Sequence, residues 1–280
     1  MAGYPRPELI ATTEWLAANL GGPDVQVIDV RWLPDGTGRA TYETGHIPGA
    51  SYVDWLEQLV ERDAESGVLQ LGSAERVANA LSAAGVGSNS TVVLYDDVGG
   101  LYAARAWWSL RVYGAPSVRI LDGGLRAWTE GGGALSRDLG VPPVATFHPS
   151  LQAGLRLTTA DVQGLIRSTG VLLVDARATA EYHGFEGNTR RLGHIPGAVN
   201  MPVASLTEPG TGRFQSSERL HDLLLKANVV GGRRIVCYDG SGVAAAKLAF
   251  LLTLAGYDDV AVYDGGWAEW GDRLDLPVDR

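Results

Sequence analysis

Short apolar runs, most of them ending in a polar residue, alternate with stretches of helical length in the second half of the chain. Such runs are typical of buried strands, and they cover residues 172–175, 199–202, 234–238 and 260–263. Residues 218–227 have the amphipathic periodicity of a helix, and residues 243–254 are rich in Ala and Leu. Thr158 and Asp161 have the spacing of a helix-capping box. Strands that alternate with helices predict an α/β fold with a mostly parallel sheet flanked by helices.

The two halves of the chain share four segments in the same order. The matching pairs are Val27–Arg31 with Leu173–Arg177, Gly45–Ala50 with Gly193–Ala198, Val92–Asp96 with Ile235–Asp239, and Leu121–Gly124 with Tyr263–Gly266. Their offsets are 146, 148, 143 and 142 residues. A period of this length is far above that of a solenoid, so each copy is expected to be a whole domain.

The stretch between the two copies does not repeat and is rich in breakers of regular structure. It contains three consecutive glycines at 131–133 and a Pro–Pro pair at 142–143. We therefore predict a first domain over residues 1–135, a linker over 136–154 and a second domain over 155–280.

Composition narrows the class of function. The 280 residues include 23 Lys and Arg against 32 Asp and Glu, a net charge of −9. This acidic balance argues against a nucleic-acid-binding protein and against an anionic membrane surface as partner. No apolar stretch is long enough for a transmembrane helix, and the first residues do not resemble a signal peptide. A soluble, cytoplasmic protein is expected.

The single cysteine and the five histidines also limit the chemistry. Cys237 alone cannot form an intramolecular disulfide or a multi-cysteine zinc site. The histidines have no metal-ligand spacing, so neither a metal nor another cofactor is expected.

The turn that follows the run 234–238 is a candidate anion site. Gly240 and Gly242 allow close backbone approach, and the helix predicted next directs its free N–H groups and its dipole toward the turn. A tight turn that serves packing alone is the alternative. The turn has neither a GxGxxG pattern nor a Walker lysine, which argues against nucleotide binding.

The repeated motifs resemble those of tandem-domain rhodaneses. Each copy has Asp-x-Arg followed by His-Ile-Pro-Gly-Ala, and Asp264–Trp270 reads Asp-Gly-Gly-Trp-Ala-Glu-Trp. The resemblance covers essentially the whole chain. It implies two rhodanese-like domains and the activity of thiosulfate and 3-mercaptopyruvate sulfurtransferases. In that family a cysteine at the start of the second turn takes up sulfane sulfur as a persulfide, which the turn N–H groups stabilise, and passes it to a thiol or to cyanide.

The chain departs from the family pattern at this cysteine. Asp239 occupies the position in the second copy, and Asp96 occupies the matching position in the first. An aspartate cannot form a persulfide, so we expect a sulfurtransferase-family protein with impaired sulfur transfer. The carboxylate would instead accept the turn N–H groups itself and would repel an anionic donor.

The resemblance also assigns the surrounding positions. The active-site loop would comprise Gly240, Ser241, Gly242, Val243 and Ala244. Arg190 falls at one of two positions where arginines hold the substrate carboxylate, and Glu181 falls at the other. His46 matches the histidine of the first His-Ile-Pro-Gly and is a candidate substrate-binding residue. A solvated surface role for Arg190 and a loop-orienting role for His46 and His194 are the alternatives.

Three other hypotheses stay open at this point. Cys237 could act as a shifted nucleophile, although its repeat partner Leu94 indicates a core position. The chain could be a binding or regulatory module without turnover. Asp239 could act as nucleophile or base on a phosphate or acyl ester. The expected partner is a small-molecule sulfur donor or another small anion, with a thiol or cyanide as acceptor if the protein is an active sulfurtransferase.

Overall fold

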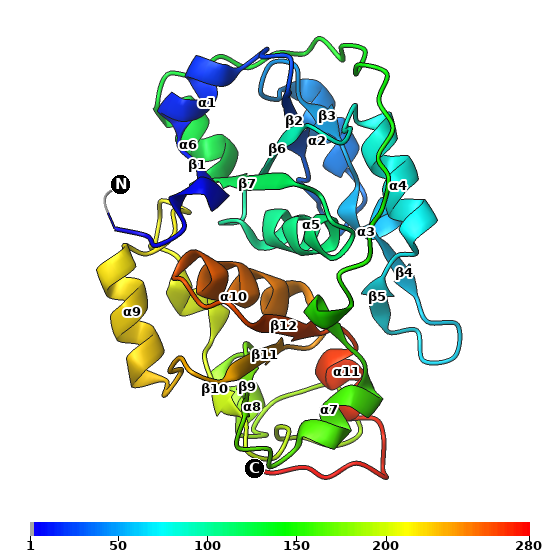
Figure 1. The fold of residues 1–280 in the computed structure, drawn as a ribbon, viewed down its shortest axis with the longest axis vertical. Helices are drawn as coiled ribbons and strands as arrows, with labels where there is room; N and C mark the ends of the chain where they lie inside the picture. Colours follow the sequence, from blue (N-terminus) through cyan, green and yellow to red (C-terminus); the bar gives the residue numbers. More distant parts are fainter. Residues whose placement is uncertain (1–2) are drawn as a thin grey trace.

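The computed structural model describes residues 3–280 as two α/β units, one from each half of the chain (Figure 1). The first unit contains β1 Ile10–Ala11, α1 Thr13–Asn19, β2 Val25–Asp29, α2 Gly38–Thr44, β3 Ser51–Tyr52, α3 Trp55–Gln58, β4 Val60–Arg62, β5 Leu69–Leu71, α4 Ala74–Ala83, β6 Thr91–Tyr95, α5 Leu101–Val112, β7 Ser117–Leu121 and α6 Gly124–Glu130. The second contains β8 Arg156–Leu157, α7 Thr159–Leu165, β9 Val171–Asp175, α8 Thr179–Tyr182, β10 Val199–Asn200, α9 Ser217–Lys226, β11 Arg234–Tyr238, α10 Val243–Leu254, β12 Val260–Tyr263 and α11 Gly266–Trp270. Short 3₁₀ turns cover Pro7–Leu9, Ala153–Leu155 and Val203–Leu206.

Each unit is built on one five-stranded parallel sheet. The strand order is β1-β7-β6-β2-β3 in the first and β8-β12-β11-β9-β10 in the second, so the two sheets have the same topology. Only the first unit adds a hairpin, in which β4 and β5 pair antiparallel. The two parallel sheets confirm the predicted α/β fold with two tandem domains. Sheets of this kind need helices on both faces.

The helices begin where the sequence provides a cap. Thr158 and Asp161 form the predicted capping box at the start of α7, each accepting the other's backbone N–H. Ser73 and Ser216 cap α4 and α9 at matching places in the two units. The strand predicted over 199–202 shortens to Val199–Asn200, since Pro202 cannot donate to a ladder.

The two units share their largest core. Helices α5 and α10 lie side by side between the sheets (Figure 1), and α4 and α9 complete the same inner layers. Helices α1 and α6 cover the outer face of the first sheet, and α7 and α11 cover that of the second. Trp107 of α5 meets Phe250 of α10 edge-to-face, with ring centroids 5.1 Å apart. Almost every side chain of α10 is buried, which explains why its sequence is apolar all round.

Each unit also binds a segment of the other through its Asp-Gly-Gly turn. The Asp264 carboxylate accepts the Leu71 N–H at 2.5 Å, and the Asp122 carboxylate accepts the Phe214 N–H at 2.8 Å. These contacts are related by the internal repeat. The interface between the units therefore has an approximate two-fold symmetry.

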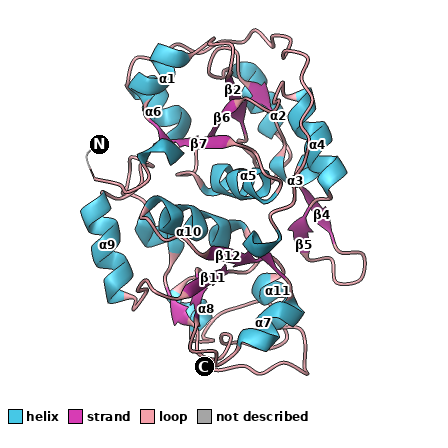
Figure 2. Cartoon of the chain, in the orientation of Figure 1, coloured by secondary structure: helices cyan, strands magenta, loops and turns pink. Residues whose placement is uncertain are grey.

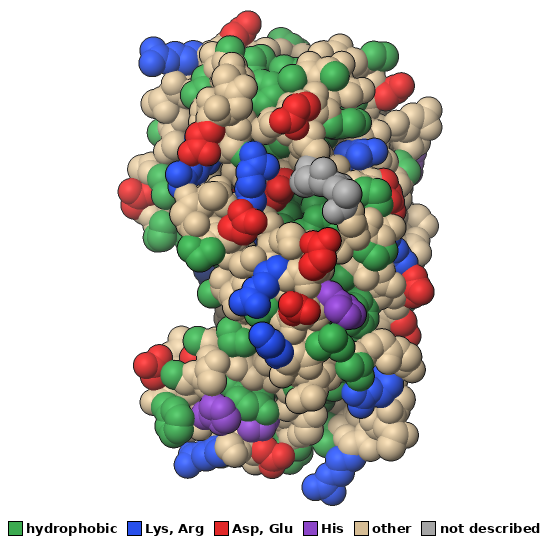
Figure 3. All heavy atoms as spheres, turned by 90° about the vertical axis from the view of Figure 1, so that its left-hand side faces the viewer, with side chains coloured by type: hydrophobic (Ala, Val, Ile, Leu, Met, Phe, Trp, Pro, Cys, Tyr) green, Lys and Arg blue, Asp and Glu red, His purple; other side chains and the backbone are tan. Residues whose placement is uncertain are grey.

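A long connection without helix or strand spans residues 137–152 and runs along the first unit before it reaches β8 (Figure 2). It is anchored at its start by an antiparallel bridge between His46 and Ser136. Positive and negative side chains are interspersed on the face drawn in Figure 3. Among the described residues, no helix combines the length and apolar character that crossing a bilayer requires.

A shared core predicts that the two units unfold together. Phe250→Ala removes a fully buried ring from the contact between α5 and α10, and we expect it to lower the free energy of unfolding by about 3–5 kcal/mol. Urea unfolding followed by tryptophan fluorescence should show one transition for both proteins, shifted to lower urea in the variant. Leu225→Ala on the exposed side of α9 is the matched control and should shift it little. Two separate transitions would contradict a common core.

Candidate functional site

The turn after β11 holds its first residue by its own backbone. Asp239 directs one carboxylate oxygen to the Gly242 N–H at 2.5 Å and the other to the Ala244 N–H at 3.0 Å. Both donors belong to the first turn of α10 or to the residue before it, where helix N–H groups lack carbonyl partners. The anion cradle expected from the sequence exists, and the Asp239 carboxylate occupies it.

At two positions of this region only glycine fits, because a Cβ would clash with a neighbouring atom and the backbone has a left-handed φ. Gly242 has φ +79°, and a Cβ there would lie 2.6 Å from Nη1 of Arg105. Gly266 at the start of α11 has φ +57°, and a Cβ there would collide with the Asp239 carbonyl oxygen. Gly240 has neither a left-handed φ nor an atom near its Cβ position. Of the two glycines that the sequence singled out, only Gly242 is required for close approach.

Burial and hydrogen bonding act on Asp239 in opposite directions. Its side chain is buried, and this burial raises the pKa of Asp239 above its ordinary value. The N–H groups of Ala244 and Gly242 and the positive charge of Arg105 favour the ionised form and partly offset the effect of burial. Gly240, Ser241 and Ala244 are half-buried, so the outer side of the loop reaches the surface.

The matching turn of the first unit repeats this arrangement more completely. Asp96 accepts the N–H groups of Val98 and Gly100 on one oxygen, and those of Tyr102 and Ala103 on the other, at 2.8–3.0 Å. In both turns, the aspartate that follows the strand accepts the N–H groups of its own turn. Asp239 behaves as the structural equivalent of Asp96.

Cys237 lies inside the shared core. Its side chain is 0 % exposed, among the residues that pack between β11 and α10. Burial, reinforced by the negative charge of Asp239, raises the pKa of the Cys237 thiol. Because the thiolate is the nucleophile, this environment favours an inert core cysteine over a shifted nucleophile.

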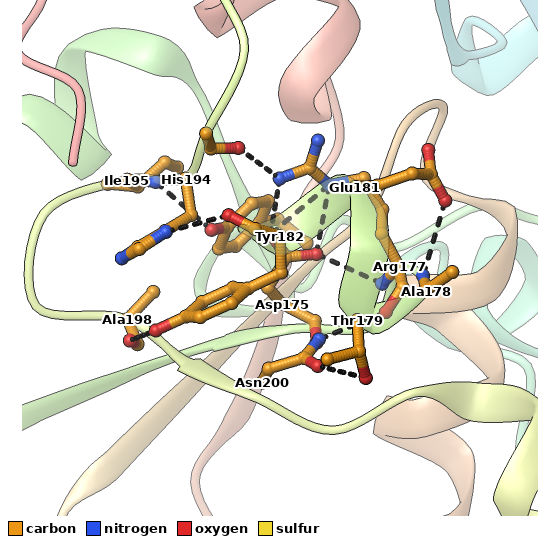
Figure 4. Close-up of polar contacts among 12 residues, drawn as sticks. Asp175, Arg177, Ala178, Thr179, Glu181, Tyr182, His194, Ile195, Ala198 and Asn200 are labelled. Carbon is orange, nitrogen blue, oxygen red and sulfur yellow. Dashed lines mark hydrogen bonds and ion pairs between the residues drawn. The ribbon is translucent and has the colours of Figure 1, made fainter. Parts of the chain in front are cut away.

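The two motif histidines have the same surroundings in the two units. His46 stacks on Tyr42 and hydrogen-bonds its carbonyl at 2.9 Å, and His194 does the same with Tyr182 (Figure 4). The other ring nitrogen of His46 lies 3.1 Å from the Asp138 carbonyl oxygen. Every hydrogen bond of the His46 ring thus joins parts of the first unit and the connection that follows it, which favours the loop-orienting role.

The hydrogen bonds of Glu181 and Arg190 in the second unit are made outside the turn. Glu181 caps α8 by accepting the Ala178 N–H at 3.2 Å (Figure 4). Arg190 is exposed, and its backbone N–H donates to Asp272 beyond the end of α11, whereas the start of α11 packs on Asp239. The substrate-binding roles of Arg190 and His46 stay predictions.

The Asp-x-Arg motif lies at the carboxyl ends of β2 and β9. Arg177 forms a two-pronged contact with Asp175 and donates to the Gly193 carbonyl at 2.7 Å, which fixes the His-Ile-Pro-Gly loop (Figure 4). Arg31 and Asp29 make the same contacts in the first unit. These motif charges are thus satisfied inside their own unit.

One residue at the turn was missed by the sequence analysis. Arg105 of α5 belongs to the first unit, is 0 % exposed, and donates to the Gly242 carbonyl at 3.2 Å and to Asp264 at 2.7 Å. A signal was present, because Arg105 is the fifth residue of its helix and Lys247 is the fifth residue of α10. A buried cation at the same place in two largely apolar helices indicates a shared role.

Lys247 is the counterpart of Arg105 on the other side of the interface. It is 4 % exposed, and its ammonium donates to the Thr207 hydroxyl at 2.5 Å. Burial lowers the pKa of Lys247 to about 8, and the negative charge of Asp96 acts against that shift. Among the described residues, no group of three His, Cys, Asp or Glu side chains could hold a metal ion.

Comparison with known proteins agrees with this architecture. A model of the rhodanese-like domain matches residues 12–131 and again residues 158–273. The chain belongs to the rhodanese family. A Mycobacterium tuberculosis protein named "Putative thiosulfate sulfurtransferase SseB" is 37 % identical over 98 % of both chains. Human 3-mercaptopyruvate sulfurtransferase is 34 % identical over 93 % of this chain and 91 % of its own.

Two solved structures superpose closely on the chain. The crystal structure of SseA from Escherichia coli, titled as a study of 3-mercaptopyruvate sulfotransferases, matches with a TM-score of 0.83 and 30 % identity, over 92 % of this chain and 98 % of that one. An anaerobic ergothioneine biosynthesis enzyme from Chlorobium limicola matches with a TM-score of 0.86, over 100 % of this chain and 72 % of that one. At 23 % identity, that likeness concerns the fold alone.

The two glycines of the rhodanese turn should differ in their tolerance of alanine. Gly242→Ala forces a left-handed φ on a residue with a Cβ and crowds the Arg105 guanidinium, so we expect a loss of about 1–3 kcal/mol in the free energy of unfolding. Gly240→Ala meets no atom and should change it by about 0.5 kcal/mol or less. Urea unfolding measures both. Equal losses of unfolding free energy in the two variants would contradict the steric and conformational requirement for glycine at position 242.

Lys247 should make stability rise with pH in mildly alkaline solution. Its pKa is about 8 in the folded chain and about 10.5 in the unfolded chain, so between these values the unfolded state binds more protons. The resulting gain between pH 7.5 and 9.5 is about 2 kcal/mol at 1.36 kcal/mol per pKa unit. Lys247→Met should lose this gain relative to the wild type, whereas exposed Lys226→Met keeps it. Parallel pH profiles for the wild type and Lys247→Met would contradict the buried-cation assignment.

Proposed function

We propose that this rhodanese-family protein is a sulfurtransferase relative whose second-unit turn, with Asp239 in place of the nucleophilic cysteine, does not carry sulfane sulfur. Its relatives are named as sulfurtransferases of thiosulfate or 3-mercaptopyruvate. The sulfur donor expected for this site is therefore a small anionic sulfur compound. The acceptor class is a thiol or cyanide. The fold and turn of a sulfurtransferase are retained, and the step that fails is storage of the sulfur.

A single observation carries the proposal. The Asp239 carboxylate accepts the Gly242 and Ala244 N–H groups, which a persulfide anion at this position would otherwise receive. An oxygen acid with no polarisable, transferable sulfur cannot substitute for the thiolate. Its negative charge also opposes the approach of a second anion to the same donors.

The surroundings of Cys237 and Asp239 support this proposal over the rival chemistries. Cys237 is fully buried in the apolar core, where its thiol has a raised pKa. Asp239 uses both of its carboxylate oxygens inside the turn, which counts against a free nucleophile or base. The binding-module hypothesis gains no specific support from the geometry.

Asp239→Cys should restore sulfur transfer. The thiolate introduced at position 239 would attack the outer sulfur of thiosulfate, sulfite would leave, and cyanide would then remove the sulfur from the persulfide as thiocyanate. Loss of a nucleophile costs enzymes several orders of magnitude, so we expect a gain of about 100-fold or more over the wild type. Thiocyanate formation with thiosulfate, and cyanide-dependent turnover of 3-mercaptopyruvate, measure it.

Asp96→Cys is the matched control, since it places a thiol in the equivalent turn of the first unit. It should remain at the wild-type level, as should Asp239→Ser. Wild-type activity equal to that of Asp239→Cys would overturn the proposal, and the Cys237→Ala variant would then identify or exclude the core cysteine. Silence of a folded Asp239→Cys protein with both donors would show that the site has diverged beyond its nucleophile.

A further inference from the structure

Arg105 reaches the second-unit turn from the first unit. It projects from α5, which lies beside α10 (Figure 1), and its Nη1 atom donates to the Gly242 carbonyl and to the Asp264 carboxylate. Gly242 is also the residue whose N–H binds Asp239. Gly242 thus links the two charges: its carbonyl accepts from Arg105 of the first unit, and its N–H donates to Asp239 of the second.

The charge of Arg105 is not cancelled by its ion pair. Asp264 binds Arg105 through one oxygen and Arg156 through the other, at 2.7 and 3.1 Å, so two guanidinium groups share one carboxylate. The Nε and Nη2 atoms of Arg105 are buried and have no hydrogen-bond partner among the described residues. A net positive charge therefore remains beside the turn, and its Arg105 part is 0 % exposed, whereas the Arg156 side chain is 31 % exposed and is partly screened by water.

Asp239 is the group that this charge favours. The side chain is buried, and besides the turn N–H groups the positive charge of Arg105 stabilises its ionised form. The N-terminal end of α10 adds its dipole in the same direction. These contributions explain how the fold holds a carboxylate at a buried position.

The other unit repeats this relation with different residues. Lys247 of α10 is buried next to the first-unit turn, and the charge of Asp96 favours its protonated form. Arg105 and Lys247 are the fifth residues of equivalent helices. A buried cation at this helix position is therefore a feature of both halves, but Arg105 bonds the opposite unit whereas Lys247 bonds Thr207 of its own unit.

We propose that Arg105 is the positioning residue of the second-unit turn: it binds the turn from the first unit and supplies the positive charge that favours an anion at position 239. In the natural chain that anion is the Asp239 carboxylate, and in Asp239→Cys it is the thiolate. The second case rests on the proposed function. The first unit, which has no reactive group of its own, would in this way control the ionisation of the reactive position.

The ionisation of a cysteine at position 239 tests the proposal directly. Thiolate absorbance near 240 nm, titrated between pH 4 and 9 in the Asp239→Cys/Cys237→Ala protein, reports this one thiol without requiring access to it. Adding Arg105→Met should raise the midpoint by about one pH unit or more, and Arg105→Lys should restore most of the difference. Lys247→Met, the equivalent cation facing the other turn, should leave the midpoint unchanged.

An unchanged midpoint in a folded Arg105→Met protein would overturn the proposal, and so would an equal shift in Lys247→Met. If Arg105→Met does not fold, the Asp239 carboxyl pKa, measured by carbon NMR in the otherwise unchanged protein and in Arg105→Gln, decides: a higher value in the Gln variant supports the role, and the same value overturns it. Turnover is assayed separately. A midpoint shift without turnover would sink the proposed function alone, and turnover without a shift would sink the role of Arg105 alone.

Discussion

The N-terminal end of α10 is enclosed between two sheets, and its free N–H groups have to be satisfied within the protein. Water reaches only the outer side of the turn, so an acceptor must be built in. Asp239 provides it by folding its carboxylate back onto Gly242 and Ala244. A hydrogen-bond acceptor at this position is a requirement of the architecture, and in this chain the Asp239 carboxylate meets it.

The interface between the units explains how a buried anion is tolerated. Each unit contributes a buried cation and an Asp-Gly-Gly turn, and each turn binds backbone from the opposite unit. The two sides are not identical, because Arg105 forms a close ion pair with Asp264, whereas Lys247 hydrogen-bonds the neutral Thr207 hydroxyl. A guanidinium stays charged over the whole physiological range, and a buried ammonium does not. The turn that carries Asp239 therefore has the cation that stays charged and that forms an ion pair.

The motifs that identify the family are architectural in this chain. The Asp-x-Arg pairs and the histidines of His-Ile-Pro-Gly make their contacts inside each unit, and they do so equally in both halves. The presence of these motifs therefore indicates the rhodanese fold, and the identity of residue 239 bears on the reaction.

The sequence by itself determined the α/β class, the duplication, and most strands and helices, since periodicity, caps and repeats are local or nearly local signals. It also indicated that Asp239 fills its own turn, because a short acidic side chain before a helix start can reach only a few N–H groups. It did not indicate which charges meet across the interface. Arg105 is 134 residues before Asp239, and the two are brought together only when α5 packs on α10. The shared core also removes Cys237 from water, and Arg190 is exposed, since burial and proximity between distant segments are decided by the tertiary structure.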